Sequence, residues 1–175
     1  MIFPTVTEII RPWVDFSKIP PAVLQHAADR GTAIHDLCAR IVRGEFVIPP
    51  DEYYLHCQSF RLWLDTLVDF HLLVEERLVD PAWGYSGQID LLVVLNDERK
   101  ALVDLKTPVI ASKSWRVQLA GYNHLCQVTG HKTDCAGSLQ LSPQGNVAKM
   151  TWYEDSAGDF NTFVQCLNVY RFFNS

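Results

Sequence analysis

Two opposite charges lie one residue apart in an otherwise apolar stretch, ALVDLKTPV, which spans residues 101–109. Side chains two positions apart in an extended strand point to the same face, so Asp104 and Lys106 would lie side by side while Leu105 faces away. As a purely structural ion pair this arrangement adds little stability, because desolvation of both charges cancels much of their attraction. The alternative is chemistry, in which the carboxylate binds a cation and the ammonium stabilises developing negative charge.

Further acidic side chains lie on the segments that should form neighbouring strands. Asp90 is embedded in the apolar stretch GYSGQIDLLVV, and Glu75 and Glu76 lie upstream in LLVEERLV. Strand alternation requires that one of the two glutamates face the same side as Asp90, but it does not say which. Carboxylates that converge from adjacent strands repel one another unless they share a proton or a cation. Hard oxygen ligands of this kind suit Mg²⁺ or Mn²⁺.

Two helical segments carry polar residues that could line the same site. The stretch DRGTAIHDL places Arg30, Thr32 and His35 on a helix. The stretch VQLAGYNHL places Gln118 and Tyr122 four positions apart, and therefore on one face of a later helix. Each also has a plain structural interpretation, as a hydrogen-bonded histidine or as a pair on a helix surface. Together with the acidic strands they define one candidate site drawn from five segments of the chain.

The elements that must position these residues follow from hydrophobic periodicity and from turn signals. Apolar residues recur with helical spacing between residues 34 and 41, which predicts a helix over residues 20–44. The other predicted elements are a helix near 53–67, consecutive antiparallel strands at 72–79, 88–95 and 101–107, a helix at 114–129, strands near 134–141 and 147–154, and a helix at 159–173. This order predicts an α/β fold with a mixed central sheet flanked by helices, in a single domain spanning residues 1–175.

Composition and charge restrict the class of protein. Hydrophobic residues make up 48% and charged residues 20% of the chain, as in ordinary globular proteins. There is no secretory signal pattern and no apolar run near the roughly 20 residues needed to cross a bilayer, so we expect a soluble cytoplasmic protein without membrane partners. The net charge of −5 argues against a large nucleic-acid footprint held by charge alone. It does not argue against a small site in which carboxylates hold a cation.

Five motifs, RGTAIH, VEERLV, GYSGQID, VDLKT and QLAGY, occur in this order along the chain. Their types and order resemble the PD-(D/E)XK nuclease superfamily, in its RecB-like branch, which includes phage exonucleases, CRISPR adaptation nucleases and mitochondrial genome-maintenance exonucleases. The opening residues are similar to small phage and prophage members. The resemblance covers residues 4 to about 125. It implies a restriction-endonuclease-like core and a metal-dependent deoxyribonuclease, of the kind used in DNA repair and recombination, that leaves 5′-phosphates.

Carried over residue by residue, the resemblance implies the composition of a metal centre. His35, Asp90 and Asp104 would bind one or two Mg²⁺ or Mn²⁺ ions, together with the backbone carbonyl of Leu105. Lys106 would be the catalytic lysine. The remaining catalytic acid of the family maps best onto Glu75, with Glu76 as the alternative.

The expected DNA contacts come from the helices and from cations near them. The family's helix motifs orient the site and touch the nucleic acid, and two further cations flank the proposed site in sequence. The residues expected to support or bind DNA are therefore Arg30, Thr32, Lys113, Arg116, Gln118 and Tyr122.

Several alternatives stay open at this point. Family members near this chain favour exonuclease action on free ends, but structure-specific endonuclease action is the alternative. A non-cleaving nucleic-acid-binding module and an assembly subunit whose partner grips the DNA are two others. CRISPR-type relatives often bind an iron–sulfur cluster through four cysteines. The five cysteines of this chain are widely spaced and include no Cys-x-x-Cys pair, so no cluster, zinc ribbon or disulfide framework is expected.

Overall fold

The computed structural model describes residues 3–174 as five α-helices, one short 3₁₀ helix and five strands. The elements before the sheet are α1 (Val6–Ile10), the 3₁₀ helix η1 (Arg11–Trp13), α2 (Pro21–Val42) and α3 (Asp51–Leu67). The sheet and its connections comprise β1 (Val68–Asp80), β2 (Tyr85–Leu95), β3 (Lys100–Lys106), α4 (Ser114–Val128), β4 (Cys135–Gln140), β5 (Lys149–Trp152) and α5 (Ser156–Asn174).

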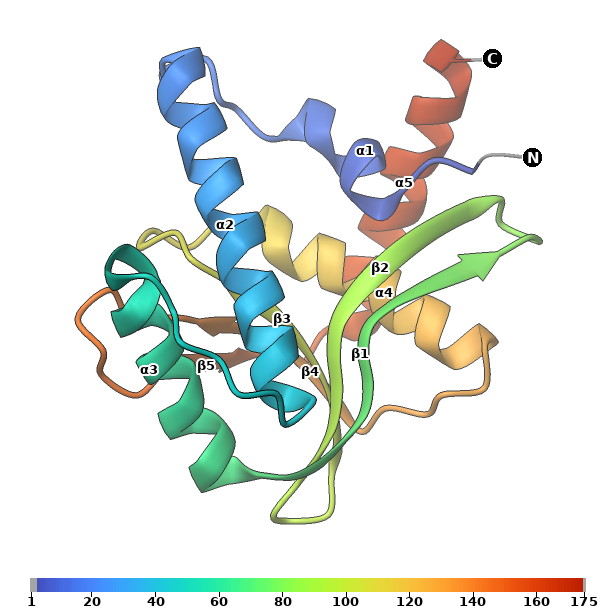
Figure 1. The fold of residues 1–175 in the computed structure, drawn as a ribbon. Helices are drawn as coiled ribbons and strands as arrows, with labels where there is room; N and C mark the ends of the chain where they lie inside the picture. The colour runs from blue at the N-terminus through green and yellow to red at the C-terminus, as the bar shows by residue number, and fades with distance from the viewer. Residues whose placement is uncertain (1–2, 175) are drawn as a thin grey trace.

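The five strands form one mixed sheet in the order β1-β2-β3-β4-β5. Strands β3 and β4 pair in parallel, and every other neighbouring pair is antiparallel. A parallel pair needs a crossover connection, and α4 supplies it. Helices α2 and α3 cover one face of the sheet, and α4 and α5 cover the other together with α1 (Figure 1). The predicted α/β architecture, with helices flanking a mixed sheet, is confirmed.

Each face of the sheet has its own core. On one face, Ile34 of α2 and Phe60 of α3 pack against Leu91 and Val93 of β2. On the other, Leu119 of α4 packs with residues of α1, α5 and the sheet. Within β3 the faces alternate as expected, with Ala101, Val103 and Leu105 in the first core and Leu102 in the second. This alternation turns Asp104 and Lys106 toward α4.

The β1–β2 hairpin exchanges its buried faces halfway along. Ile89 belongs to the core beneath α4, although Leu91, two residues later, belongs to the core beneath α2. In β1, Leu78 belongs to the core beneath α4, whereas Val74 packs against the core beneath α2. Between them, Glu75 has a left-handed backbone with φ of 53°, which is uncommon for a non-glycine residue. The exchange brings polar side chains of both strands to the border between the two cores.

Two features differ from the prediction or were not predicted. Strand β1 begins at Val68, directly after α3, and no glycine or proline marks the boundary between the two elements. Helix α1 is held by a capping box, in which Thr5 Oγ1 accepts from the amide of Glu8 at 3.2 Å and Glu8 Oε2 accepts from the amide of Thr5 at 2.8 Å. The T-x-x-E pattern was the available signal. Among residues 3–174, no helix is long and apolar enough to span a membrane.

Candidate active site

Three side chains from three elements converge at the border between the two cores. His35 of α2, Glu75 of β1 and Asp90 of β2 each offer a ligand atom, and these atoms lie within 4.8 Å of one another. The left-handed backbone of Glu75 places its side chain here, whereas Glu76 is exposed. The structure therefore brings Glu75, and not Glu76, to the candidate site.

Asp90 is the centre of this group and joins two strands to α2. Its Oδ1 lies 3.1 Å from Nδ1 of His35, and its Oδ2 accepts from the amide of Leu105 at 2.6 Å. The β2–β3 ladder ends at the pair Leu91 and Val103. Beyond that pair, the Asp90 side chain continues the link between the two strands by accepting from the Leu105 amide. Burial opposes ionisation of Asp90, but the charge and hydrogen bond of His35 outweigh it and lower the pKa of Asp90.

His35 is correspondingly biased toward its charged form. Burial disfavours the imidazolium, but the Asp90 carboxylate beside it raises the pKa of His35 from 6.5 to about 9. The His35 side chain keeps 26% of its surface exposed and lines an open cleft. A histidine in this setting can exchange its proton for a cation.

Asp104 and Lys106 form a second pair on the neighbouring strand, as their spacing predicted. Lys106 Nζ lies 2.5 Å from Asp104 Oδ2, so the two groups form a close, largely buried ion pair. Burial, reinforced by Asp90, outweighs the attraction of Lys106 and raises the pKa of Asp104 to about 6. Asp104 is thus a buried carboxylate whose ionised form is poorly compensated. It is not part of the three-residue group around Asp90.

A polar chain holds Lys106 in place from α4. Lys106 Nζ donates to Gln118 Oε1 at 2.9 Å, and Gln118 Nε2 donates to Tyr122 Oη at 3.1 Å. Tyr122 Oη lies 3.4 Å from Thr7 Oγ1 at the start of the chain. Gln118 and Tyr122 therefore position the lysine, and Tyr122 is buried and directed at the protein rather than at solvent.

Glu75 has a partner that the sequence analysis missed. Gln88 Nε2 donates to Glu75 Oε2 at 2.5 Å, from a position two residues before Asp90 on β2. Burial and the charge of Asp90 raise the pKa of Glu75, although Gln88 partly offsets them. The spacing of Gln88 from Asp90 was a signal that could have identified it. For Leu105, the recorded contact is its amide, and a role for its carbonyl stays a prediction.

The residues expected to bind DNA fall into three separate places. Arg30, Lys113 and Gln118 line a groove of about 810 Å³ beside Lys106. Thr32 lines a cleft of about 390 Å³ on the other side of α2, together with His35, Glu75 and Gln88. Arg116 points elsewhere. Its Nε lies 2.6 Å from Oδ1 of Asp159 on α5, and its guanidinium packs over the ring of Tyr153.

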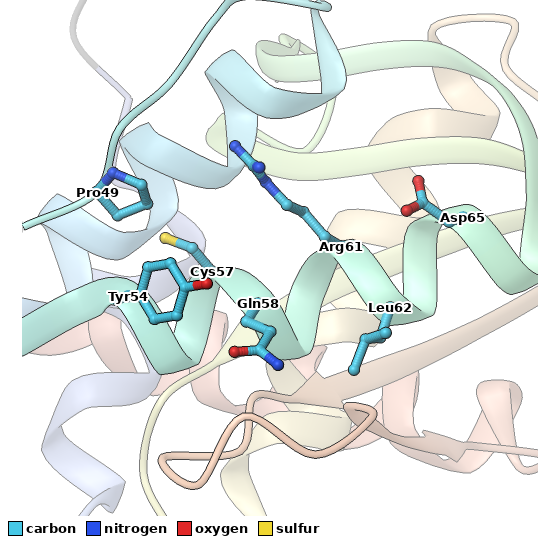
Figure 2. Close-up of a pocket in the computed structure, with 7 residues that line it drawn as sticks. All are labelled: Pro49, Tyr54, Cys57, Gln58, Arg61, Leu62 and Asp65. Carbon is cyan, nitrogen blue, oxygen red and sulfur yellow. The ribbon is translucent and has the colours of Figure 1, made fainter. Parts of the chain in front are cut away.

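A smaller cavity of about 110 Å³ lies along α3, and its lining includes none of the candidate site residues (Figure 2). Arg61, one of its lining residues, donates to the carbonyl of Val47 and so ties α3 to the preceding loop. Cys57 also lines this cavity and is buried. Neither residue faces a carboxylate of the candidate site, and we assign this cavity no chemistry. All five cysteines are free thiols.

Comparisons with known proteins add no assignment. No protein-family model matches the chain, and no curated protein matches it. Any functional interpretation of the site therefore depends on its residues and their geometry.

Proposed function

We propose that this chain is a Mg²⁺- or Mn²⁺-dependent deoxyribonuclease that hydrolyses phosphodiester bonds at free DNA ends and leaves 5′-phosphates. We further propose that its core is restriction-endonuclease-like, because acidic residues from three consecutive antiparallel strands are followed by a crossover helix and a parallel strand. The observation that carries the proposal is one juxtaposition. The group of His35, Glu75 and Asp90 adjoins a buried carboxylate, Asp104, that is paired with Lys106.

The residues present fit a divalent cation. One imidazole and two carboxylates offer ligand atoms within 4.8 Å of one another, and the buried Asp104 beside them adds a third carboxylate, one oxygen of which is paired with Lys106. His35, Glu75, Asp90 and Asp104 would hold the ion. When bound, it would lower the pKa of a water molecule and neutralise charge on the scissile phosphate. The single nitrogen donor favours Mn²⁺ over Mg²⁺, which strongly prefers oxygen ligands.

The other roles in hydrolysis fall to side chains of the protein. Hydrolysis adds the oxygen of water to phosphorus and breaks the bond to the 3′ oxygen, which receives a proton. Lys106 is held by Gln118 at the edge of the groove, where its ammonium can stabilise negative charge that develops on the phosphate. Asp104 keeps that ammonium close to the acidic group. Because both contacts exist before substrate binds, little reorganisation is needed at the moment of reaction.

The direct test is a time course on end-labelled DNA with Mn²⁺, using linear single-stranded, linear duplex and circular substrates. We expect linear DNA to be shortened from its ends, products to carry 5′-phosphates, and EDTA to stop the reaction. Circular DNA should stay intact, and its cleavage would indicate an endonuclease instead.

A matched pair of variants separates the site from the rest of the protein. Asp104→Asn removes a buried site carboxylate and should abolish cleavage. Glu76→Gln neutralises an exposed carboxylate one residue from Glu75 and should leave cleavage unchanged. If Asp104→Asn cuts DNA as fast as the unmodified protein, the proposed site is incorrect. If the unmodified protein binds DNA but cuts none of the substrates, the chain is a binding module.

A further inference from the structure

The groove beside Lys106 is closed on one side by the start of the chain. We define residues 5–19 as the N-terminal strap. It runs from α1, beside α5, to the upper end of α2 (Figure 1). Thr7, Arg11 and Phe16 of the strap line the groove, and residues of α2, of the loop after β3 and of α4 form its other walls. The groove is therefore a half-open passage between the strap and the loop after β3.

This passage leads to the candidate catalytic lysine. The ring of Trp115, which lines the groove, lies 5.7 Å from Lys106 Nζ. Gln118, another lining residue, accepts the hydrogen bond from the same nitrogen. Thr107, the residue after Lys106, also faces the groove. A polymer lying in the passage would thus have one of its backbone groups next to Lys106.

The passage is both apolar and cationic. Phe16, Ile19 and Ile110 line it, and Ile110 is 84% exposed although it is a large apolar side chain. Arg11, Arg30 and Lys113 supply three cations against the single carboxylate of Asp15 among the lining residues. Within the described part of the chain, the buried Nε of Arg30 has no hydrogen-bond partner. In a chain with a net charge of −5, this local excess of positive charge complements a polyanion.

We propose that this groove takes single-stranded DNA and excludes the intact duplex. The inference rests on the proposed function, since it names the form of DNA that the site receives. In a duplex the bases are stacked and paired, so a protein meets phosphates and groove edges. An apolar wall gains little from those groups, and this groove carries apolar side chains on the strap and on the loop after β3. Unpaired bases instead present flat faces that pack on aromatic and apolar side chains while cations track the phosphates.

The test measures binding without cleavage. Fluorescence anisotropy of a labelled oligothymidine and of a blunt duplex of the same length is recorded with Ca²⁺ as the only divalent cation, and gels confirm that the DNA stays intact. We expect the single strand to bind at least about tenfold more tightly than the duplex. Phe16→Ala should weaken single-strand binding by about fivefold or more, the lower end of what one base–aromatic stack contributes.

Two control variants match the two kinds of contact. Phe46→Ala removes an aromatic ring that is 88% exposed on the loop between α2 and α3, and it should change neither affinity. Lys113→Ala should weaken binding and reduce its salt dependence by about one unit of slope, whereas Lys132→Ala, beyond the far end of α4, should not.

The outcomes separate this inference from the proposed function. Equal or tighter binding of the duplex overturns the inference, and so does an unchanged single-strand affinity in Phe16→Ala. Selective single-strand binding by a protein that cuts no DNA would retain the inference and refute the nuclease proposal. Cleavage combined with equal binding of both DNA forms would retain the nuclease proposal and overturn the inference.

Discussion

The pairing of His35 with Asp90 makes the stability of the metal-free protein depend on pH in a specific direction. The pKa of His35 is raised to about 9 in the folded protein, against 6.5 for an unperturbed imidazole. A group whose folded pKa is raised adds stability that is fully present below its unfolded pKa and is lost as the pH rises through its folded pKa. The loss should therefore occur between about pH 6.5 and pH 9.

Its size follows from the same two values. Each pH unit between them corresponds to about 1.4 kcal/mol, so the His35–Asp90 interaction adds about 3 kcal/mol at low pH. For a chain of this length, a change of that size moves the melting temperature by roughly 6–12 °C. The assay is thermal or urea unfolding in EDTA at a series of pH values, on the unmodified protein and on His35→Gln. The difference between the two curves removes the contribution of all other titrating groups.

His26→Gln is the control, because it makes the same change at an exposed position on the same helix. We expect the stability advantage of the unmodified protein over His35→Gln to be largest near pH 6 and to vanish above pH 9, with no such trend for His26→Gln. Parallel curves for the unmodified protein and His35→Gln across this range would show that the ion pair does not form. The assignment of Asp90 as an ionised carboxylate held by His35 would then be incorrect.

Three other outcomes test the remaining parts of the site. Glu75→Gln should weaken Mn²⁺ binding in calorimetry, and Glu76→Gln should not; equal effects would mean that Glu75 does not face the ion. Asp90→Asn should lower the melting temperature in EDTA, because lost hydrogen bonds cost about 1–3 kcal/mol. Asp104→Asn should raise the melting temperature at pH 7, because burial opposes the ionised form of Asp104. The reverse order of the two melting temperatures would contradict these protonation states. Lys106→Ala should retain Mn²⁺ binding but lose cleavage by orders of magnitude, as expected for a group that acts on the transition state, and unimpaired cleavage would remove that role.

Much of the fold could be predicted because hydrophobic periodicity and turn residues indicate the same element boundaries. Helical periodicity identified α2 and α4 almost to the residue, and apolar runs separated by turn residues identified β2 and β3. Strand alternation also placed Asp104 beside Lys106, and their ion pair is present. These are local properties, and they need no knowledge of what packs against the strand.

The parts that could not be predicted depend on backbone irregularity or on distant partners. The choice between Glu75 and Glu76 is decided by a left-handed residue in the middle of a strand, which no periodicity reveals. Arg116 lies near Gln118 in sequence, but Asp159, 43 residues away, pairs with it on the other side of α4. The closure of the groove by the N-terminal strap is likewise a long-range contact, and only its capping box was visible in the sequence.

The exchange of buried faces in the β1–β2 hairpin also determines where this protein can tolerate inserted or deleted residues. In a regular hairpin, a one-residue insertion turns every later side chain to the opposite face. Here Val74 and Leu78 already face different cores, so the hairpin is effectively two short hairpins in series. An insertion beyond the exchange would alter only the outer part, between Leu78 and Tyr85, and leave the inner ladder in register. A change of length in the outer part would thus act on the contacts that Asp80 and Trp83 make with α4 and α5, while the candidate site stays fixed at the joint.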